Sequence, residues 1–275
     1  MTGRDGTVYA IGGNNGTRLL ATVWAYTPSE DRWISAPPLA TPRDGLAAAV
    51  DPSGRLYAIG GSGAVGGSSQ TTTLTSVARY DPTIGSWSTI ASLSIARHDL
   101  AAAATADGRI YAIGGIGTSG PTNTVEVYDP ALDRWTTARS LPAPRYGAAA
   151  VRGSDGRIYL IGGHDESAPT ASVLAYDPAR DSWSTVAPLQ TARFNLAAAV
   201  GVDGRIYAIG GRTSSGAVNT VEVYTPATGA WALARPMPTA RYALGAATSL
   251  DGRLYAIGGN RPPIQVTDAV EVYTP

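Results

Sequence analysis

The chain of 275 residues contains no cysteine and no lysine, and it has only two histidines. The absence of cysteine excludes disulfide frameworks, thiolate nucleophiles and cysteine-ligated zinc, and it leaves the redox compartment undetermined. The absence of lysine excludes Schiff-base catalysis through a lysine amine. Several classes of covalent and metal-dependent enzyme are therefore ruled out by composition.

The chain also lacks an excess of either charge, because 21 arginines balance 21 aspartates and glutamates. A binder of nucleic acid or of an anionic membrane needs a basic surface, so neither partner is expected. No segment approaches the roughly 18 apolar residues of a membrane span, and the N-terminal residues lack the apolar core of a signal peptide. We therefore expect a soluble chain, cytoplasmic by default, or secreted if a leader precedes Met1 in a longer protein.

What the sequence does contain is a repeat. The tripeptide Ile-Gly-Gly occurs six times, with successive spacings of 48, 54, 48, 48 and 48 residues. A tyrosine precedes each glycine pair by three residues, and a second tyrosine follows it. In five repeats a tryptophan stands seven residues beyond that second tyrosine, and an arginine then opens an alanine-rich run. These arginines are Arg43, Arg97, Arg145, Arg193 and Arg241.

Each repeat predicts four short strands. The alanine-rich run is the first strand, and in four repeats an Asp-Gly turn, such as Asp107-Gly108, joins it to the second. Asp-Gly between apolar runs is a strong hairpin signal, because a type I′ turn needs positive φ at both central residues. The second strand ends at the glycine pair, the third alternates polar and apolar residues, and the fourth carries the tryptophan. With no sustained helical period, the predicted fold class is all-β.

This combination of a glycine pair, a tyrosine and a tryptophan at regular offsets resembles the kelch repeat, and the resemblance covers essentially the whole chain. It implies a single kelch β-propeller domain over residues 1–275, with four-stranded antiparallel blades arranged radially. The tyrosines and tryptophans would then fill space between neighbouring blades. Six blades are expected, with repeats at about 1–40, 41–94, 95–142, 143–190, 191–238 and 239–275.

Counting the predicted strands leaves the first and last blades incomplete. The second and third strands occur six times, whereas the arginine-led inner strand and the tryptophan strand occur five times. Either the chain is a piece of a longer six-bladed protein, or the ring tolerates two three-stranded blades. An unclosed ring is expected to associate with itself through its open sheet edges.

The second repeat is longer than the others by six residues, which lie between Ser62 and Thr73. Long loops often carry function. The glycine, serine and threonine in this stretch instead favour a plain flexible linker.

The strand order predicts where a binding site lies. The loop after the second strand and the segment that leads into the first strand emerge on the same face of a blade, and the arginine-led segments lie nearest the axis. The residues expected to bind a partner are Arg43, Asp44, Arg97, His98, Arg145, Tyr146, Arg193, Phe194, Asn195, Arg241 and Tyr242, with His164 and Arg212 in the loops after the glycine pairs.

The repeated arginines have two interpretations. The resemblance implies a pocket, because arginines at this position of partner-binding kelch domains receive acidic peptide segments, and a guanidinium group binds a carboxylate through two hydrogen bonds. The alternative is that each arginine braces adjacent blades through backbone carbonyls. The residues that follow each arginine vary between repeats, which favours them as determinants of specificity.

Both histidines lie next to acidic residues. His164-Asp165-Glu166 has the side chains of a metal site, but three consecutive loop residues seldom converge on one ion, so neither a metal nor a cofactor is expected. An imidazole oriented by Asp99 would suit His98 for general-base work. Adjacent residues entering a strand point to opposite faces, however, so a His98–Asp99 dyad is not expected.

The predicted function is therefore a non-enzymatic scaffold that binds an acidic peptide, protein or glycan through its arginine and aromatic residues. The alternatives are a carbohydrate-active enzyme, such as a sugar epimerase on the same fold, and a purely structural repeat fragment. Oxidases of the galactose oxidase kind need a copper site with a cysteine-crosslinked tyrosine and paired histidines, which this chain lacks. Fold alone does not select among the remaining functions, and no catalytic residue is predicted.

Overall fold

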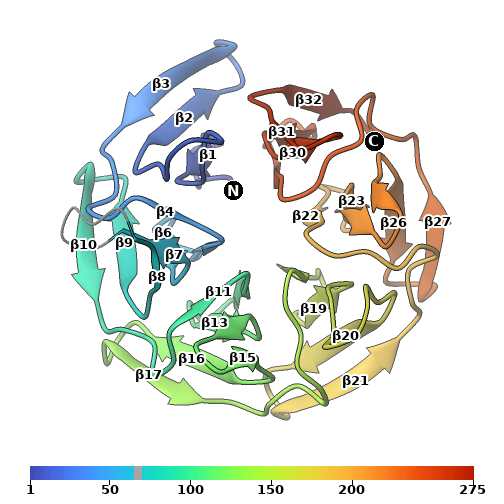
Figure 1. Ribbon diagram of the computed structural model, residues 1–275, viewed down its shortest axis with the longest axis horizontal. Coiled ribbons are helices and arrows are strands. Elements are labelled where there is room, and N and C mark those ends of the chain that lie inside the picture. Colours follow the sequence, from blue (N-terminus) through green and yellow to red (C-terminus); the bar gives the residue numbers. More distant parts are fainter. Residues whose placement is uncertain (65–69) are drawn as a thin grey trace. The chain divides into compact units, whose positions relative to one another are not determined.

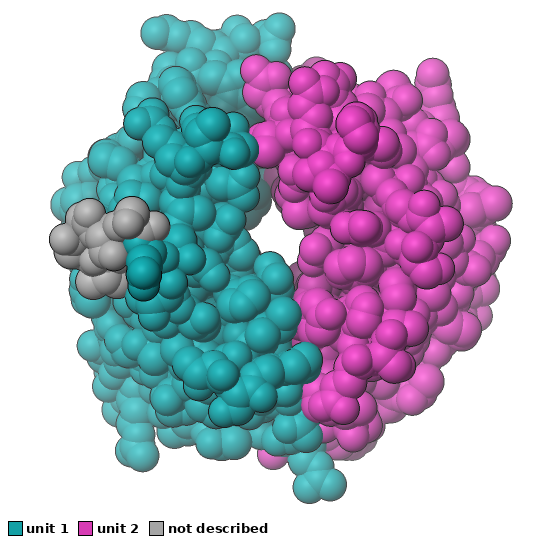
Figure 2. All heavy atoms as spheres, viewed as in Figure 1, with its two compact units in different colours: residues 1–140 teal, residues 141–275 magenta. Residues whose placement is uncertain are grey.

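The computed structural model describes residues 1–64 and 70–275, and in these residues it consists of short strands joined by turns (Figure 1). The chain divides into two compact units, residues 1–140 and 141–275, which Figure 2 distinguishes by colour. Each unit contains three main antiparallel sheets. In the described residues no helix has the length and apolarity needed to cross a membrane.

The first unit contains one three-stranded and two four-stranded sheets. The first sheet is formed by β1 (Val8–Ile11), β2 (Val23–Thr27) and β3 (Arg32–Ala36). The second is formed by β5 (Ala47–Val50), β6 (Leu56–Ile59), β9 (Val77–Asp81) and β10 (Ser86–Ile90). The third is formed by β12 (Ala101–Ala104), β13 (Ile110–Ile113), β16 (Val125–Asp129) and β17 (Arg134–Thr137).

The second unit contains two four-stranded sheets and then a three-stranded one. They are formed by β18 (Ala149–Arg152), β19 (Ile158–Ile161), β20 (Val173–Asp177) and β21 (Ser182–Val186); by β22 (Ala197–Val200), β23 (Ile206–Ile209), β26 (Val221–Thr225) and β27 (Ala230–Leu233); and by β28 (Gly245–Thr248), β29 (Leu254–Ile257) and β32 (Val270–Tyr273). These sheets confirm the all-β class and the four-stranded antiparallel repeat. In the described residues, the first sheet lacks the inner strand and the last lacks the tryptophan strand, as the repeat count predicts.

Small sheets of two or three very short strands lie beside the main sheets, next to the glycine pairs. They are β4 (Arg43–Asp44), β7 (Ser62–Gly63) and β8 (Thr72–Thr73); β11 (Arg97–His98), β14 (Ile116–Gly117) and β15 (Gly120–Pro121); β24 (Arg212–Thr213) and β25 (Gly216–Ala217); and β30 (Asn260–Arg261) and β31 (Gln265–Val266). Part of the predicted long loop of the second repeat, residues 65–69, lies outside the described residues.

The core of each unit lies between neighbouring sheets. The alanine-rich first strands of successive sheets contact one another, β5 with β12 in the first unit and β22 with both β18 and β28 in the second. The second strands are buried on both faces, and every residue of β6 is 0% exposed. Alanine suits the inner strands because its small side chain lets successive sheets approach closely.

In five repeats the second tyrosine packs on the tryptophan that follows it. The ring centroids of Tyr128 and Trp135 are 5.2 Å apart, and the other four pairs lie between 4.9 and 5.2 Å. The indole N–H of Trp135 also donates a hydrogen bond to the carbonyl oxygen of Ala91, in the preceding repeat, at 2.8 Å. The predicted structural role of these aromatic residues is confirmed.

Replacing Trp135 by phenylalanine should lower the free energy of unfolding by about 1 kcal/mol, because the Ala91 carbonyl loses its donor. Urea denaturation followed by circular dichroism measures this change. Trp33→Phe is the matched control: Trp33 packs on Tyr26 at 5.0 Å, but no indole hydrogen bond is found for it in the described residues. Equal losses in the two variants would contradict a role for the Trp135 hydrogen bond.

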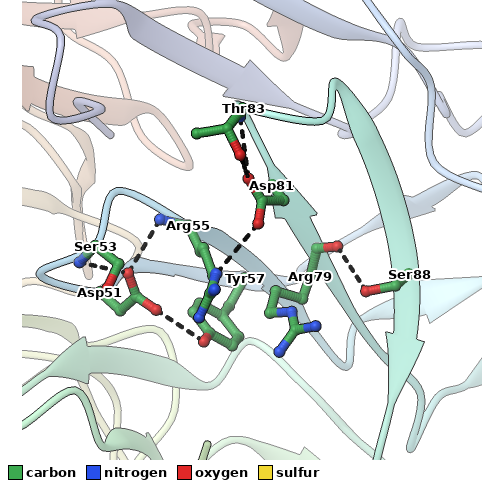
Figure 3. A network of polar contacts seen from close by, with 8 residues as sticks. All are labelled: Asp51, Ser53, Arg55, Tyr57, Arg79, Asp81, Thr83 and Ser88. Carbon is green, nitrogen blue, oxygen red and sulfur yellow. Dashed lines mark hydrogen bonds and ion pairs between the residues drawn. The ribbon is translucent and has the colours of Figure 1, made fainter.

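Opposite the glycine pairs, the hairpin between β5 and β6 is closed by a polar network (Figure 3). The carboxylate of Asp51 accepts hydrogen bonds from the backbone N–H groups of Ser53 at 2.8 Å and Arg55 at 3.0 Å, and from the Tyr57 hydroxyl at 3.0 Å. Arg55 also forms an ion pair of 3.3 Å with Asp81. Burial, reinforced by Asp51, raises the pKa of Tyr57. This network fixes the turn between the two strands.

Candidate functional site

Within each unit, two glycine pairs bring the chain past the arginine-led segment of the next repeat. Gly60 has φ of +59°, and a Cβ atom there would lie only 2.5 Å from the carbonyl oxygen of Arg97. The backbone N–H of Gly61 donates a hydrogen bond to that same oxygen at 2.9 Å. Glycine is therefore required both for the left-handed conformation and for the close approach. The corresponding contacts join Gly12-Gly13 to Arg43, Gly162-Gly163 to Arg193 and Gly210-Gly211 to Arg241.

The side chains of the five repeated arginines are buried. Arg97, Arg193 and Arg241 are 0% exposed, Arg43 is 3% exposed and Arg145 is 8% exposed. Burial lowers the pKa of Arg97 and Arg193, and the neighbouring glutamates only partly offset this effect.

Arg97 shows how such a group is accommodated. Its Nη1 donates hydrogen bonds to the carbonyl oxygens of Gly114 at 3.0 Å and Thr124 at 2.9 Å. Its Nη2 forms an ion pair of 2.6 Å with Glu126, which is itself buried. All three partners belong to the repeat that Arg97 opens. Similar contacts join Arg193 to Thr220, Ala208 and Glu222, and Arg241 to Gly258, Ala269 and Glu271.

The contacts of the arginines therefore stabilise the fold, but they join other parts of the chain than expected. The guanidinium groups hold the second and third strands of their own repeat, whereas the expectation was a contact between adjacent blades. The neighbouring repeat is reached instead through the arginine backbone carbonyl, which the glycine pair binds. Direct partner binding by these arginines stays a prediction, and the burial of Arg97, Arg193 and Arg241 keeps their guanidinium groups away from the surface.

The residue after each arginine pairs with the residue after the glycine pair of the same repeat. The two predicted surface segments thus lie together, as the strand order requires. Their side chains are half-buried or exposed, and they differ between repeats. The pairs are Asp44 with Ser62, His98 with Ile116, Tyr146 with His164, Phe194 with Arg212, and Tyr242 with Asn260.

In the first unit three of these four positions are polar, the exception being Ile116. Asn14 donates a hydrogen bond to Asp44 at 2.8 Å, and Nδ1 of His98 lies 3.3 Å from a carboxylate oxygen of Asp99. The Asp99 hydrogen bond raises the pKa of His98, with burial opposing it and the charges of Asp99 and Asp44 adding to it. The expectation that His98 and Asp99 point apart is wrong, because Asp99 has φ of +51° and is not part of an extended strand.

In the second unit four of the six corresponding positions carry aromatic rings. The rings of Tyr146 and His164 are stacked at 5.0 Å, and Phe194 meets His164 edge-on at 5.1 Å. Next to Phe194, the guanidinium carbon of Arg212 lies 5.5 Å from the ring centroid of Tyr242. We call these five residues the aromatic surface.

Within each unit, the second residue after the arginine links successive repeats, and this role was not recognised from the sequence. Asn195 has φ of +49°, and its N–H donates to the carbonyl oxygen of Gly147 at 2.6 Å. Ala243 donates in the same way to Asn195 at 2.7 Å, and Asp99 to Gly45 at 2.7 Å. Asn195, predicted as a binding residue, thus holds two repeats together through its backbone. Four of the five residues at this position are glycine, aspartate or asparagine, which tolerate left-handed conformations, so a signal was present.

The loop that contains His164 is organised by Asp165. Its carboxylate accepts hydrogen bonds from the N–H of Ala168 at 2.9 Å and from the hydroxyl and N–H of Ser167 at 2.7 and 2.8 Å, and these bonds lower its pKa to about 2. Nδ1 of His164 faces the Asp165 carbonyl oxygen. Across the described residues, no group of three or more histidine and acidic side chains is arranged to hold a metal ion.

The glycine pairs and the packed tyrosines and tryptophans recur along the chain. Comparison with known families identifies the same repeat. Residues 4–193 and 101–274 match the KLHDC2/KLHL20/DRC7 Kelch-repeats domain. The chain belongs to the kelch-repeat family. Among solved structures it is similar to YjhT, with a TM-score of 0.80 over 98% of this chain and 92% of YjhT at 17% identity, which supports the kelch propeller fold.

One curated relative is beta-scruin from Limulus polyphemus. It is 35% identical to this chain over 107 residues, which make up 38% of this chain and 12% of beta-scruin. The kelch repeats described here thus match a small part of the length of that relative.

Proposed function

We propose that this kelch protein is a non-enzymatic binding protein whose aromatic surface binds an acidic protein or peptide. Kelch domains commonly bind proteins. The observation that carries the proposal is the cluster of Tyr146, His164 and Phe194, half-exposed beside the exposed cation of Arg212. Aromatic and arginine side chains dominate the energetic centres of protein interfaces.

The difference between repeated and varying positions also supports this surface. The glycine pairs and buried arginines recur because they build the sheets. The side chains that follow the arginines do not build the sheets in this way. In the second unit three of them are nevertheless aromatic: Tyr146, Phe194 and Tyr242. Grouped half-exposed aromatic residues on one surface are typical of an interaction site.

The finer architecture belongs to the same proposal. Six glycine-pair strands and, in the described residues, six main sheets support a six-bladed propeller. In such a propeller the arginine-led segments of all blades would lie around the axis on one face.

The proposal is tested by probing peptide and glycan arrays with the wild type and with a Tyr146→Ala/Phe194→Ala/Tyr242→Ala variant. The variant should bind the acidic peptides selected by the wild type at least about tenfold more weakly, because the anchoring rings are lost. Val202→Ala/Leu250→Ala is the matched control, since these apolar residues are 70% and 69% exposed and lie in hairpins at the opposite end of the sheets. Unchanged binding by the aromatic variant would overturn the proposal.

A carbohydrate-active enzyme is the second candidate function, and the His98–Asp99 contact is the observation in its favour. A proton on Nδ1 of His98 would be held by Asp99, which leaves Nε2 to accept a proton from a substrate. The glycan arrays distinguish the two functions, because an enzyme would select sugars and convert them, with loss of turnover in His98→Gln.

A further inference from the structure

Of the five buried arginines, Arg145 has the fewest hydrogen bonds and ion pairs. Its Nη1 donates a hydrogen bond to the carbonyl oxygen of Gly162 at 2.9 Å. Arg97, Arg193 and Arg241 each bind at least two carbonyl oxygens and form an ion pair with a glutamate. In the described part of the chain, no carboxylate forms a hydrogen bond or an ion pair with Arg145.

The missing partner is explained by a substitution within the repeat. Glu126 and Glu222 occupy the second position of the third strand, each opposite an alanine of the second strand. In the repeat of Arg145 this position is Leu174, and the residue opposite is Leu160. Both leucines are buried, at 6% and 1% exposure. Two leucines thus replace an alanine and the glutamate that would neutralise the arginine.

Arg145 also lies next to the aromatic surface. It directly precedes Tyr146, and a Cβ atom on Gly163 would lie 2.8 Å from Cδ of Arg145, so the arginine runs beneath the residue before His164. At 8% exposure Arg145 is the most accessible of the five arginines. Asp165 attracts it electrostatically, but the Asp165 carboxylate is already engaged by Ser167 and Ala168.

We propose that Arg145 binds a carboxylate of a partner peptide whose adjacent aromatic side chain packs on Tyr146, His164 and Phe194. This inference rests on the proposed function and narrows the partner to a protein segment that carries an acidic residue next to an aromatic one. The carboxylate takes the place of the glutamates that pair with Arg97, Arg193 and Arg241 in their own repeats, and it supplies the charge-assisted hydrogen bonds that Arg145 lacks.

The neighbouring backbone brings a second cation to the same surface. Phe194 and Arg212 exchange both backbone hydrogen bonds, at 3.0 and 2.8 Å, so a ring and a guanidinium group stand side by side. Arg212 is exposed, and its contact with Tyr242 restrains it. The aromatic surface thus combines rings that pack against one another with positive charge, which is complementary to an acidic aromatic segment.

The test is a titration of the isotope-labelled chain, followed by NMR at low salt, with three short peptides. Acetyl-Glu-Phe-amide should bind about tenfold more tightly than acetyl-Gln-Phe-amide, which lacks the carboxylate, and than acetyl-Glu-Ala-amide, which lacks the ring. The perturbed signals should include those of His164 and Phe194. Equal affinities for the three peptides would overturn the inference.

The decisive variant is Leu160→Ala/Leu174→Glu, which gives this repeat the alanine and glutamate of its neighbours. Because Arg145 is then neutralised internally, the preference for Glu-Phe over Gln-Phe should fall to less than about twofold. Phe194→Ala is the complementary surface variant, which should keep the preference for glutamate over glutamine but lose that for phenylalanine over alanine. If the double variant does not fold, Arg145→Met replaces it, with the same expected loss.

Persistence of the tenfold glutamate preference in a folded variant without an available Arg145 would show that the carboxylate binds elsewhere. The two proposals fail separately. Only this inference fails if the Tyr146→Ala/Phe194→Ala/Tyr242→Ala variant no longer binds the array-selected peptides but the wild type binds the three short peptides equally well. If that triple variant still binds the array-selected peptides as the wild type does, the proposed function itself fails.

Discussion

Replacing Gly60 by alanine is expected to lower the free energy of unfolding by roughly 3–4 kcal/mol. The new Cβ atom would lie 2.5 Å from the carbonyl oxygen of Arg97 and 3.4 Å from that of Leu74. Both are backbone atoms within the clamp that joins two repeats, so neither can move aside without separating the repeats. Urea denaturation followed by tryptophan fluorescence measures the loss.

Gly85→Ala separates the clash from the backbone conformation. Gly85 has φ of +73°, close to that of Gly60, but a Cβ atom there would have nothing within 4 Å. Its substitution should cost only the left-handed conformation, about 1 kcal/mol. If both variants lost the same stability, close approach at the glycine pair would not be what requires glycine.

Replacing Arg193 by methionine is expected to destabilise the protein by about 3–5 kcal/mol. The change leaves the carboxylate of Glu222, which is 0% exposed, without its cation. It also removes the donors to the carbonyl oxygens of Thr220 and Ala208. An uncompensated charge in the interior is the larger part of this cost, and chemical denaturation again provides the measurement.

The double variant Arg193→Met/Glu222→Leu should recover at least half of that loss. An apolar pair of similar volume avoids the buried charge. Leu174 shows that the equivalent position of another repeat accommodates leucine. A double variant as unstable as Arg193→Met alone would mean that the stability loss comes from the missing hydrogen bonds to the carbonyl oxygens. The unpaired carboxylate of Glu222 would then not be its cause.

Much of the fold was predictable because the sequence repeats. Five recurring landmarks identify the strands, the turns and the aromatic pairs, since each is a local pattern that occurs five or six times. The direction of the arginine brace was not predictable in the same way. The partners of Arg97 lie 17, 27 and 29 residues further along the chain, and only folding places them around one guanidinium group.

The site was predicted only in part. Tyr146, Phe194 and Tyr242 were identified because they follow the arginines, but their contacts with His164 and Arg212 depend on pairing between segments. The His98–Asp99 contact was missed because alternation of side chains holds for extended backbone, and Asp99 is left-handed. The special environment of Arg145 did have a sequence signal, since Val173-Leu174 stands where Val125-Glu126 and Val221-Glu222 stand elsewhere.

The central claim is that the repeated arginines build the scaffold, Arg145 alone among them also binding the partner, and that the residues after the arginines form the binding surface. The most direct test measures stability and affinity for one array-selected acidic peptide in Arg193→Met and in Phe194→Ala, which alter adjacent residues. Arg193→Met should lose about 3–5 kcal/mol of stability but bind the peptide within about twofold of the wild type while folded. Phe194→Ala should stay within about 1 kcal/mol of wild-type stability but bind at least about tenfold more weakly. The reverse pattern, with affinity lost in a stable Arg193→Met and kept in Phe194→Ala, would contradict the claim.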